Sequence, residues 1–160
     1  MKTFENYEEA CFGAGCFWSV QSAFDEKSGV VETDVGFMGG HTKNPTYRDV
    51  CYLNTGHAEV VHLKFNPKIV SYNELLDLFF SIHDPTQYNR QGPDIGSQYR
   101  SVIFYYNEKQ KKEALKVIEK VQKKLKEKIF TQVVKAEEFY KAEEYHQKYL
   151  KKQGRGCCRI

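Results

Sequence analysis

Residues 9–18 read EACFGAGCFW, and they predict a strand, a tight glycine turn and the start of a helix in immediate succession. The apolar residues up to Phe12 are typical of a short strand, and Gly13 and Gly15 permit a sharp turn after it. Beyond the turn, four side chains recur at helical spacing: Phe17, Val20, Gln21 and Phe24. The first helix is therefore expected to begin directly where the first strand ends.

The following 90 residues repeat this order of elements. Further strands are expected at residues 30–37, 57–65 and 98–106, with a loop at 36–47. Ser71 and Glu74 form a capping box that opens a second helix, which Pro85 ends. The order βαβ followed by βαβ predicts an α+β fold, a ferredoxin-like split βαβ two-layer sandwich with a mixed sheet and helices on one face.

The C-terminal third adds elements to this core. Residues 84–96 form a long connection rich in proline and glycine, and long connections are often functional. Asn107 can cap a lysine-rich helix. An edge strand is expected after it at 131–139, and a last helix at 140–152. We expect one catalytic domain over residues 1–153 and a flexible arm with Gly and Cys residues at 154–160.

Composition narrows the class of protein. The chain has 160 residues, 41% of them hydrophobic, and a mean hydropathy of −0.64, without an apolar run of about 20 residues that could cross a membrane. The acidic N-terminus has no signal-peptide pattern, so we expect a soluble protein of the cytoplasm. We also expect a monomer. Residues 109–128 hold nine Lys and three Glu within a total charge of +3. Their spacing indicates the solvated face of a helix and not a nucleic-acid site.

Five cysteines, at positions 11, 16, 51, 157 and 158, are an odd number at irregular spacing, which argues against a disulfide framework. Without a C-x-x-C pair they also do not favour zinc, and we expect no metal and no other cofactor. Cys16 stands out because it lies at the start of a predicted helix. There the helix dipole can lower a thiol pKa from about 8.5 to roughly 3.5–7.5 and so produce a nucleophilic thiolate. The alternative is a small buried apolar residue.

Six motifs in order resemble those of peptide methionine sulfoxide reductases of the A type. The resemblance is dense over residues 9–106 and looser over 138–150. The motifs are Gly13-Ala14-Gly15-Cys16-Phe17-Trp18, Gly39-Gly40-His41 with Asn44-Pro45-Thr46-Tyr47, Thr55-Gly56-His57-Ala58-Glu59, His83-Asp84-Pro85-Thr86, Asn89-Arg90-Gln91-Gly92-Pro93-Asp94 and Gly96-Ser97-Gln98-Tyr99-Arg100-Ser101.

The resemblance implies thiol-dependent reduction of the S epimer of methionine sulfoxide, free or in proteins, with thioredoxin or a similar dithiol as reductant. Cys16 would be the nucleophile and Glu59 the acid that protonates the departing oxygen. Without the resemblance, an exposed carboxylate on a strand face would be the commoner reading of Glu59. Three further matched residues would supply the polar groups around that oxygen: Tyr47, Tyr99 and Asp94. Phe17 and Trp18 match the family's pocket for the methyl group.

A second thiol must then resolve the oxidised Cys16, and the resemblance points to the C-terminal arm. Cys157 and Cys158 are both candidates, and the sequence leaves open which of them acts. A bond between two adjacent cysteines closes a strained ring, so we expect one to attack Cys16 while the other assists or does nothing. Cys51 and Cys11 are interpreted as structural.

Two other functions share these cysteines. A redox sensor or binding module would use Cys16 and the arm as a reversible switch and would not need Glu59. A thiol peroxidase would oxidise Cys16 with peroxide far faster than with methionine sulfoxide.

Overall fold

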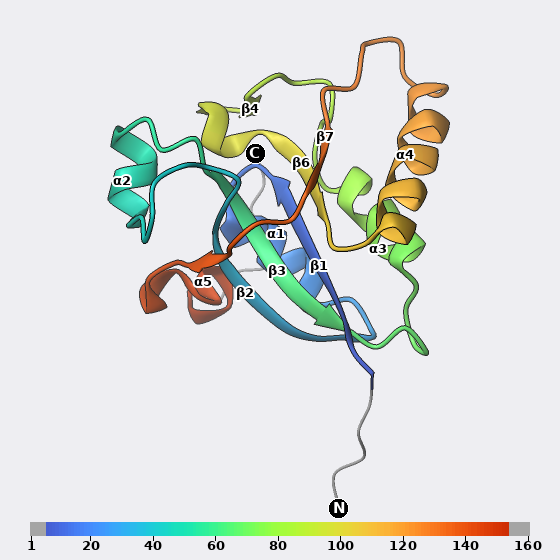
Figure 1. Ribbon diagram of the computed structural model, residues 1–160, viewed down its shortest axis with the longest axis horizontal. Helices are drawn as coiled ribbons and strands as arrows, with labels where there is room; N and C mark the ends of the chain where they lie inside the picture. Colours follow the sequence, from blue (N-terminus) through green and yellow to red (C-terminus); the bar gives the residue numbers. More distant parts are fainter. Residues whose placement is uncertain (1–5, 154–160) are drawn as a thin grey trace, which may run out of the picture.

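The computed structural model describes residues 6–153 and centres on a six-stranded mixed sheet (Figure 1). The strands lie in the order β7-β6-β1-β3-β2-β8, and only the β6–β7 pair is parallel. The inner order β6-β1-β3-β2 is that of a ferredoxin-like fold, which confirms the predicted fold class. The strand bounds are β1 Glu8–Ala14, β2 Val30–Met38, β3 Ala58–Phe65, β6 Ser101–Tyr105, β7 Gln132–Lys135 and β8 Tyr140–Lys141.

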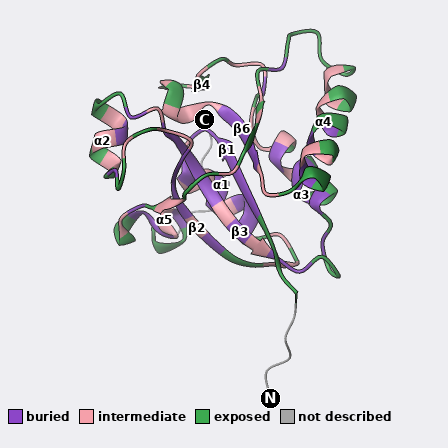
Figure 2. Cartoon of the chain, viewed as in Figure 1, coloured by how far each residue is buried: buried purple, intermediate pink, exposed green. Residues whose placement is uncertain are grey.

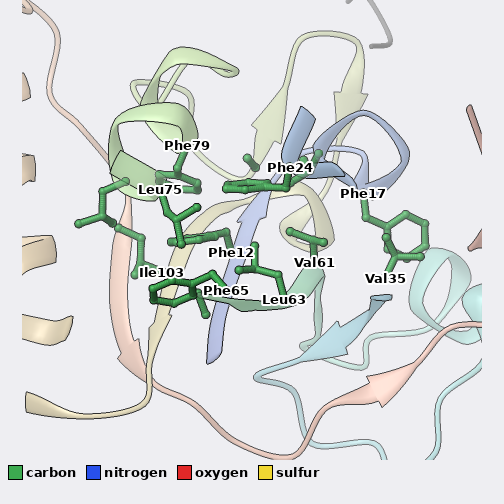
Figure 3. Packing of buried hydrophobic residues seen from close by; sticks show 14 of the residues in the cluster. Phe12, Phe17, Phe24, Val35, Val61, Leu63, Phe65, Leu75, Phe79 and Ile103 are labelled. Carbon is green, nitrogen blue, oxygen red and sulfur yellow. The ribbon is translucent and has the colours of Figure 1, made fainter. Parts of the chain in front are cut away.

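Three helices cover one face of this sheet and bury the main core. These are α1 Phe17–Asp25, α3 Tyr72–Ser81 and α4 Glu108–Gln122. Phe12 of β1 lies at the centre, with its ring 5.3 Å from Phe24 of α1 and 5.2 Å from Phe79 of α3 (Figure 3). Each fully buried side chain of this size contributes about 1.5–3 kcal/mol by leaving water. The predicted caps are also present: Ser71 with Glu74 on α3, and Asn107 on α4.

The opposite face of the sheet carries a smaller core that the C-terminal segment covers. Cys11 and Val60 belong to this core, and Phe139 packs against it from the chain between β7 and β8, which crosses the sheet in Figure 1. The approach is close at Gly36, where a Cβ atom would collide with the carbonyl oxygen of Tyr140. Both faces of the inner strands are therefore buried (Figure 2).

The predicted helix at 140–152 is wrong. This segment contains β8, a 3-10 turn at Glu144–His146 and only four residues of helix, α5 Tyr149–Lys152. The physical reason is a set of contacts with β2: the Gln147 side chain accepts from Val35 N and donates to Val35 O, both at 2.9 Å. Lys148 then adopts a left-handed backbone conformation with φ +57°, which interrupts any continuous helix.

Smaller differences concern loops around the end of the sheet. β6 begins at Ser101 and not at 98, because Ser97–Tyr99 form a 3-10 turn, and β7 is shorter than the expected strand at 131–139. A helix that was not predicted, α2 Tyr47–Tyr52, follows a capping box of Thr46 and Asp49. The connection at 84–96 contains a minimal hairpin of β4 Arg90–Gln91 and β5 Asp94–Ile95.

None of the helices within residues 6–153 combines the length and apolar character that crossing a membrane requires. The arm at 154–160, with Cys157 and Cys158, lies outside the described residues.

The position of Phe12 leads to a test of the core. Phe12→Ala removes a fully buried ring from three aromatic contacts, so we expect it to lower the free energy of unfolding by about 3–5 kcal/mol. Tyr52→Ala is the control, because Tyr52 is 80% exposed and its loss should change stability by no more than about 0.5 kcal/mol. Urea unfolding followed by circular dichroism measures both, and equal losses would contradict this description of the core.

Candidate active site

Cys16 lies in the turn between β1 and α1, at the end of the sheet. Gly15 before it has φ +91°, and a Cβ there would lie 2.8 Å from the Cβ of Gln91 in the 84–96 connection. This turn therefore requires glycine for both its conformation and its close contact. Cys16 is half-buried, and its carbonyl oxygen accepts from the Ser19 hydroxyl at 3.0 Å in the first turn of α1.

Glu59 of β3 places a buried carboxyl group next to this turn. Its Oε1 accepts from the backbone N–H of Phe17 at 3.2 Å, one residue from the thiol. The side chain is only 1% exposed, and Oε2 has no hydrogen-bond partner among residues 6–153. The exposed-carboxylate alternative is therefore wrong.

Burial has a direct electrostatic consequence for Glu59. Loss of hydration raises the pKa of its carboxyl group to about 8, and the negative charge of Asp94 acts in the same direction. The N–H of Phe17 opposes this shift by stabilising the carboxylate. Glu59 thus holds a proton at neutral pH that Oε2 can donate.

The surroundings of Cys16 oppose the thiolate that its position in the sequence predicts. Burial raises the pKa of the Cys16 thiol to about 12, with further contributions from the charges of Glu59 and Asp94. The backbone N–H groups of Trp18 and Ser19 favour the thiolate, as the helix start predicted, but their effect is smaller. The prediction of a lowered pKa was wrong because sequence position showed the helix start and not the burial around it.

Two tyrosine hydroxyls complete the polar part of the site. Tyr47 begins α2 and Tyr99 lies in the 3-10 turn before β6; burial raises the pKa of both, so both remain donors. Burial raises the pKa of the Cys51 thiol while Tyr47 and Tyr99 oppose that shift, so Cys51 lies beside both hydroxyls, a position that its interpretation as structural did not indicate. Asp94 of β5 is close enough for its charge to raise the pKa of Tyr99 as well.

Phe17 and Trp18, the residues expected to form the methyl pocket, follow Cys16 at the start of α1 and differ in exposure. Phe17 is 1% exposed, and its ring lies 5.7 Å from Phe37 and 6.0 Å from Tyr47. Trp18 is partly exposed, and its indole stacks on Tyr149 at 3.8 Å with an interplanar angle of 12°.

Sequence reasoning missed the contribution of the C-terminal segment to the site. The indole N–H of Trp18 donates to Nδ1 of His146 at 3.0 Å. His146 and Tyr149 belong to the looser part of the resemblance, and the incorrect helix at 140–152 gave no reason to place them here. Among residues 6–153, no three His, Cys, Asp or Glu side chains are grouped as metal ligands would be.

The fold and the site together define a thiol enzyme in which a buried acid lies beside the candidate nucleophile. The family model described as peptide methionine sulfoxide reductase matches residues 8–160. The chain belongs to this family, whose members reduce methionine sulfoxide.

Relatives and solved structures agree with this assignment. The chain is 53% identical to the peptide methionine sulfoxide reductase MsrA of Methanothermobacter thermautotrophicus, over 99% of this chain and 95% of the relative. For MsrA of Methanosarcina acetivorans the identity is 56%, over 94% and 81% of the two chains. Reduced Mxr1 from Saccharomyces cerevisiae has a TM-score of 0.89 at 38% identity, covering 95% of this chain and 88% of Mxr1. Mxr1 in complex with Trx2 has a TM-score of 0.65 at 25% identity, covering 92% and 90%.

The raised pKa of Glu59 predicts how stability depends on pH. The folded protein retains a proton that the unfolded chain, with an ordinary pKa of 4.5, releases, so this stabilising contribution is present below pH 4.5 and is lost as pH rises towards 8. We expect the unfolding free energy of the unmodified protein to fall relative to that of Glu59→Gln between pH 5 and 8, by at most about 1.4 kcal/mol per pH unit. Urea unfolding at several pH values measures this difference, and a constant difference would contradict the buried protonated acid.

Proposed function

We propose that this chain reduces the S epimer of methionine sulfoxide, in proteins and as the free amino acid, with Cys16 as nucleophile and Glu59 as acid. The observation that supports this most strongly is the Glu59 carboxyl group. It is buried, it keeps its proton at neutral pH, and its Oε2 is without a partner in the described chain. Its Oε1 accepts a hydrogen bond from the backbone N–H of Phe17, the residue after Cys16.

The sulfoxide oxygen needs a proton before it can leave sulfur. Glu59 would donate that proton, and the hydroxyl groups of Tyr47 and Tyr99 would donate hydrogen bonds to the same oxygen. All three groups are protonated at neutral pH: burial raises the pKa of Glu59 to about 8, and it raises the pKa of both tyrosines further above their ordinary value of 10. Asp94 would be the fourth polar group, and its charge already acts on both Glu59 and Tyr99.

The apolar side of the site would bind the methyl group on the sulfoxide sulfur. Phe17 is buried and Trp18 is partly exposed, so the indole can face a ligand while the phenyl ring supports it from the core. A methyl group bound on one side and an oxygen on the other would orient the sulfur towards Cys16. Such an arrangement distinguishes the two epimers, because exchanging the lone pair and the oxygen would place the oxygen away from its donors.

The chemical step transfers one oxygen atom from sulfur to sulfur. Cys16 attacks the sulfoxide sulfur, the S–O bond breaks, and the oxygen ends on Cys16 as a sulfenic acid while methionine departs. The substrate sulfur gains two electrons and Cys16 loses two. Glu59 protonates the oxygen and recovers a proton from the Cys16 thiol, so the carboxyl group is regenerated. The protonated Cys16 of the resting protein is compatible with this transfer, because thiol and acid exchange protons within one site.

A second thiol then reduces the sulfenic acid. Cys157 or Cys158 would attack Cys16, release water and form a disulfide, which thioredoxin or a similar dithiol would reduce by exchange. The structure of Mxr1 in complex with Trx2 supports thioredoxin as reductant. The cytoplasmic location that the sequence favours would supply such a partner.

A single-turnover experiment tests the chemical step. Reduced protein mixed with excess R,S-methionine sulfoxide and no reductant is expected to form about one methionine per chain from the S epimer, with a mass change that fits a disulfide. Cys16→Ser should abolish this turnover, and Glu59→Gln should slow it by about 10²–10⁴-fold because it removes the proton donor. Cys11→Ala is the control, since Cys11 lies in the smaller core on the opposite face of the sheet. No methionine together with rapid oxidation of Cys16 by peroxide would favour the sensor or the peroxidase.

The resolving cysteine is tested by Cys157→Ser and Cys158→Ser. We expect both variants to complete the first turnover and one of them to lose continued turnover with thioredoxin. Intact mass after the first turnover should show a retained oxygen on that variant and a disulfide on the other. If both single variants still recycle, there is no unique resolving cysteine.

A further inference from the structure

His146 is a buried imidazole that the proposed mechanism does not use. It lies in the 3-10 turn Glu144–His146 and is 1% exposed. Its Nδ1 accepts the indole N–H of Trp18 at 3.0 Å. An indole nitrogen only donates, so Nδ1 carries no proton and the neutral ring carries its proton on Nε2. Nε2 is buried and has no partner within residues 6–153.

The surroundings of this ring keep it neutral. Aromatic rings of Phe17, Tyr47 and Tyr145 lie 5.4, 4.3 and 4.0 Å from it, so burial lowers the pKa of His146. The negative charge of Glu143 opposes this shift by raising the pKa of His146. The Glu143 carboxylate also accepts a hydrogen bond from the backbone N–H of Tyr47 at 3.2 Å. Protonation of His146 would place a second N–H against that of Trp18 and break their hydrogen bond.

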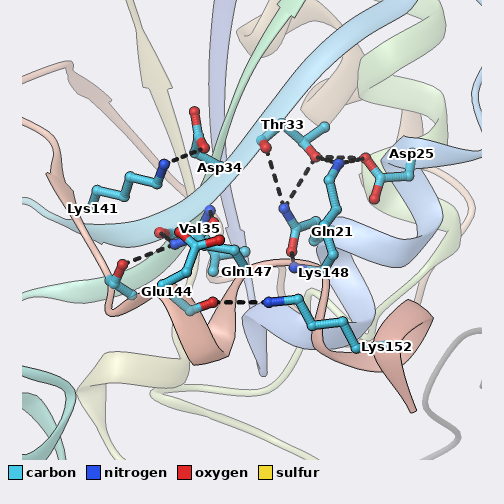
Figure 4. Close-up of polar contacts among 11 residues, drawn as sticks. Gln21, Asp25, Thr33, Asp34, Val35, Lys141, Glu144, Gln147, Lys148 and Lys152 are labelled. Atoms are coloured by element: carbon cyan, nitrogen blue, oxygen red, sulfur yellow. Dashed lines mark hydrogen bonds and ion pairs between the residues drawn. The ribbon is translucent and has the colours of Figure 1, made fainter.

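Anchoring bonds directly after His146 hold this part of the chain in place (Figure 4). Gln147 pairs through its amide with the backbone of Val35, as described above. The Lys148 ammonium group lies 2.6 Å from the carboxylate of Asp25 and 2.7 Å from the hydroxyl of Thr33. His146 is therefore fixed by β2 and α1 independently of its bond to Trp18.

We propose that His146 is a positioning residue that orients the indole of Trp18 for substrate binding. Tyr149 contacts the face of the indole and His146 holds its N–H edge, so together they define both the tilt and the rotation of the ring. Without the acceptor the indole can rotate about its side-chain torsions while Tyr149 still stacks on it. This inference rests on the proposed function, in which Trp18 binds the methyl group of the sulfoxide.

Two substitutions separate the acceptor from the ring that carries it. His146→Asn retains an acceptor oxygen near the position of Nδ1, whereas His146→Phe retains a ring without an acceptor. For methionine sulfoxide reduction with a dithiol, we expect His146→Phe to raise KM about 5–10-fold with a smaller change in kcat, the magnitude of one lost hydrogen bond. His146→Asn is expected to restore most of the loss. Equal losses in both variants would overturn the proposal.

The fluorescence of Trp18 provides a second readout that needs no substrate. Trp18 is the only tryptophan of the chain, so the emission reports this indole alone. We expect a shifted emission and stronger iodide quenching in His146→Phe, and little change in His146→Asn. His62→Phe is the matched control, because His62 of β3 contacts Phe139, on the face of the sheet that α1 and Trp18 do not cover. A spectrum of His146→Phe that matches that of the unmodified protein would contradict the positioning role.

A double-mutant cycle distinguishes positioning through Trp18 from a general structural role. In a Trp18→Phe background the phenyl ring has no N–H to donate, so His146→Phe should cause no further rise in KM. A loss as large as in the unmodified background would show that His146 acts otherwise. If the unmodified protein reduces no methionine sulfoxide, the proposed function fails, while the fluorescence comparison still decides whether His146 orients the indole.

Discussion

The hydrogen bond from Phe17 N to Glu59 Oε1 is the contact on which the site depends. It joins the first residue of α1 to the start of β3, so the acid is bonded to the residue that directly follows Cys16. A carboxyl group buried without any donor would be costly to ionise, whereas one with two donors would lose its proton easily. A single N–H holds Oε1 in place, while burial keeps the pKa of the carboxyl group raised and Oε2 has no hydrogen-bond partner among residues 6–153.

The same burial that raises the pKa of Glu59 also raises that of Cys16. At first sight this opposes nucleophilic catalysis, because the thiolate is the reactive form. The two groups nevertheless suit one another when an oxygen atom is transferred, since the reaction needs a proton at the oxygen as much as an electron pair at the thiol. If positive charge at the start of α1 dominated the site, it would favour the Cys16 thiolate and would also favour loss of the proton from Glu59.

Much of the fold was predictable because it depends on local patterns. The capping box of Ser71 and Glu74 and the order of elements predicted the ferredoxin-like core. Val61, Leu63 and Phe65, which alternate along β3, all belong to the main core under the helices. The last segment was not predictable in this way. Its helix-like spacing is overridden by bonds of the Gln147 side chain to Val35, 112 residues away, and a periodicity argument cannot include such bonds.

By itself the sequence determined the family, the ferredoxin-like fold class and the residues that could take part in chemistry. Motif order and residue type carry that information, because a catalytic thiol, an acid and two phenols must be encoded as such. The tertiary structure alone decided their protonation and their neighbours. It buried Glu59 beside the half-buried Cys16, placed Cys51 beside both tyrosines, and brought His146 to Trp18. Desolvation and contacts between distant segments arise only when the chain is folded, so neither can be deduced from local sequence.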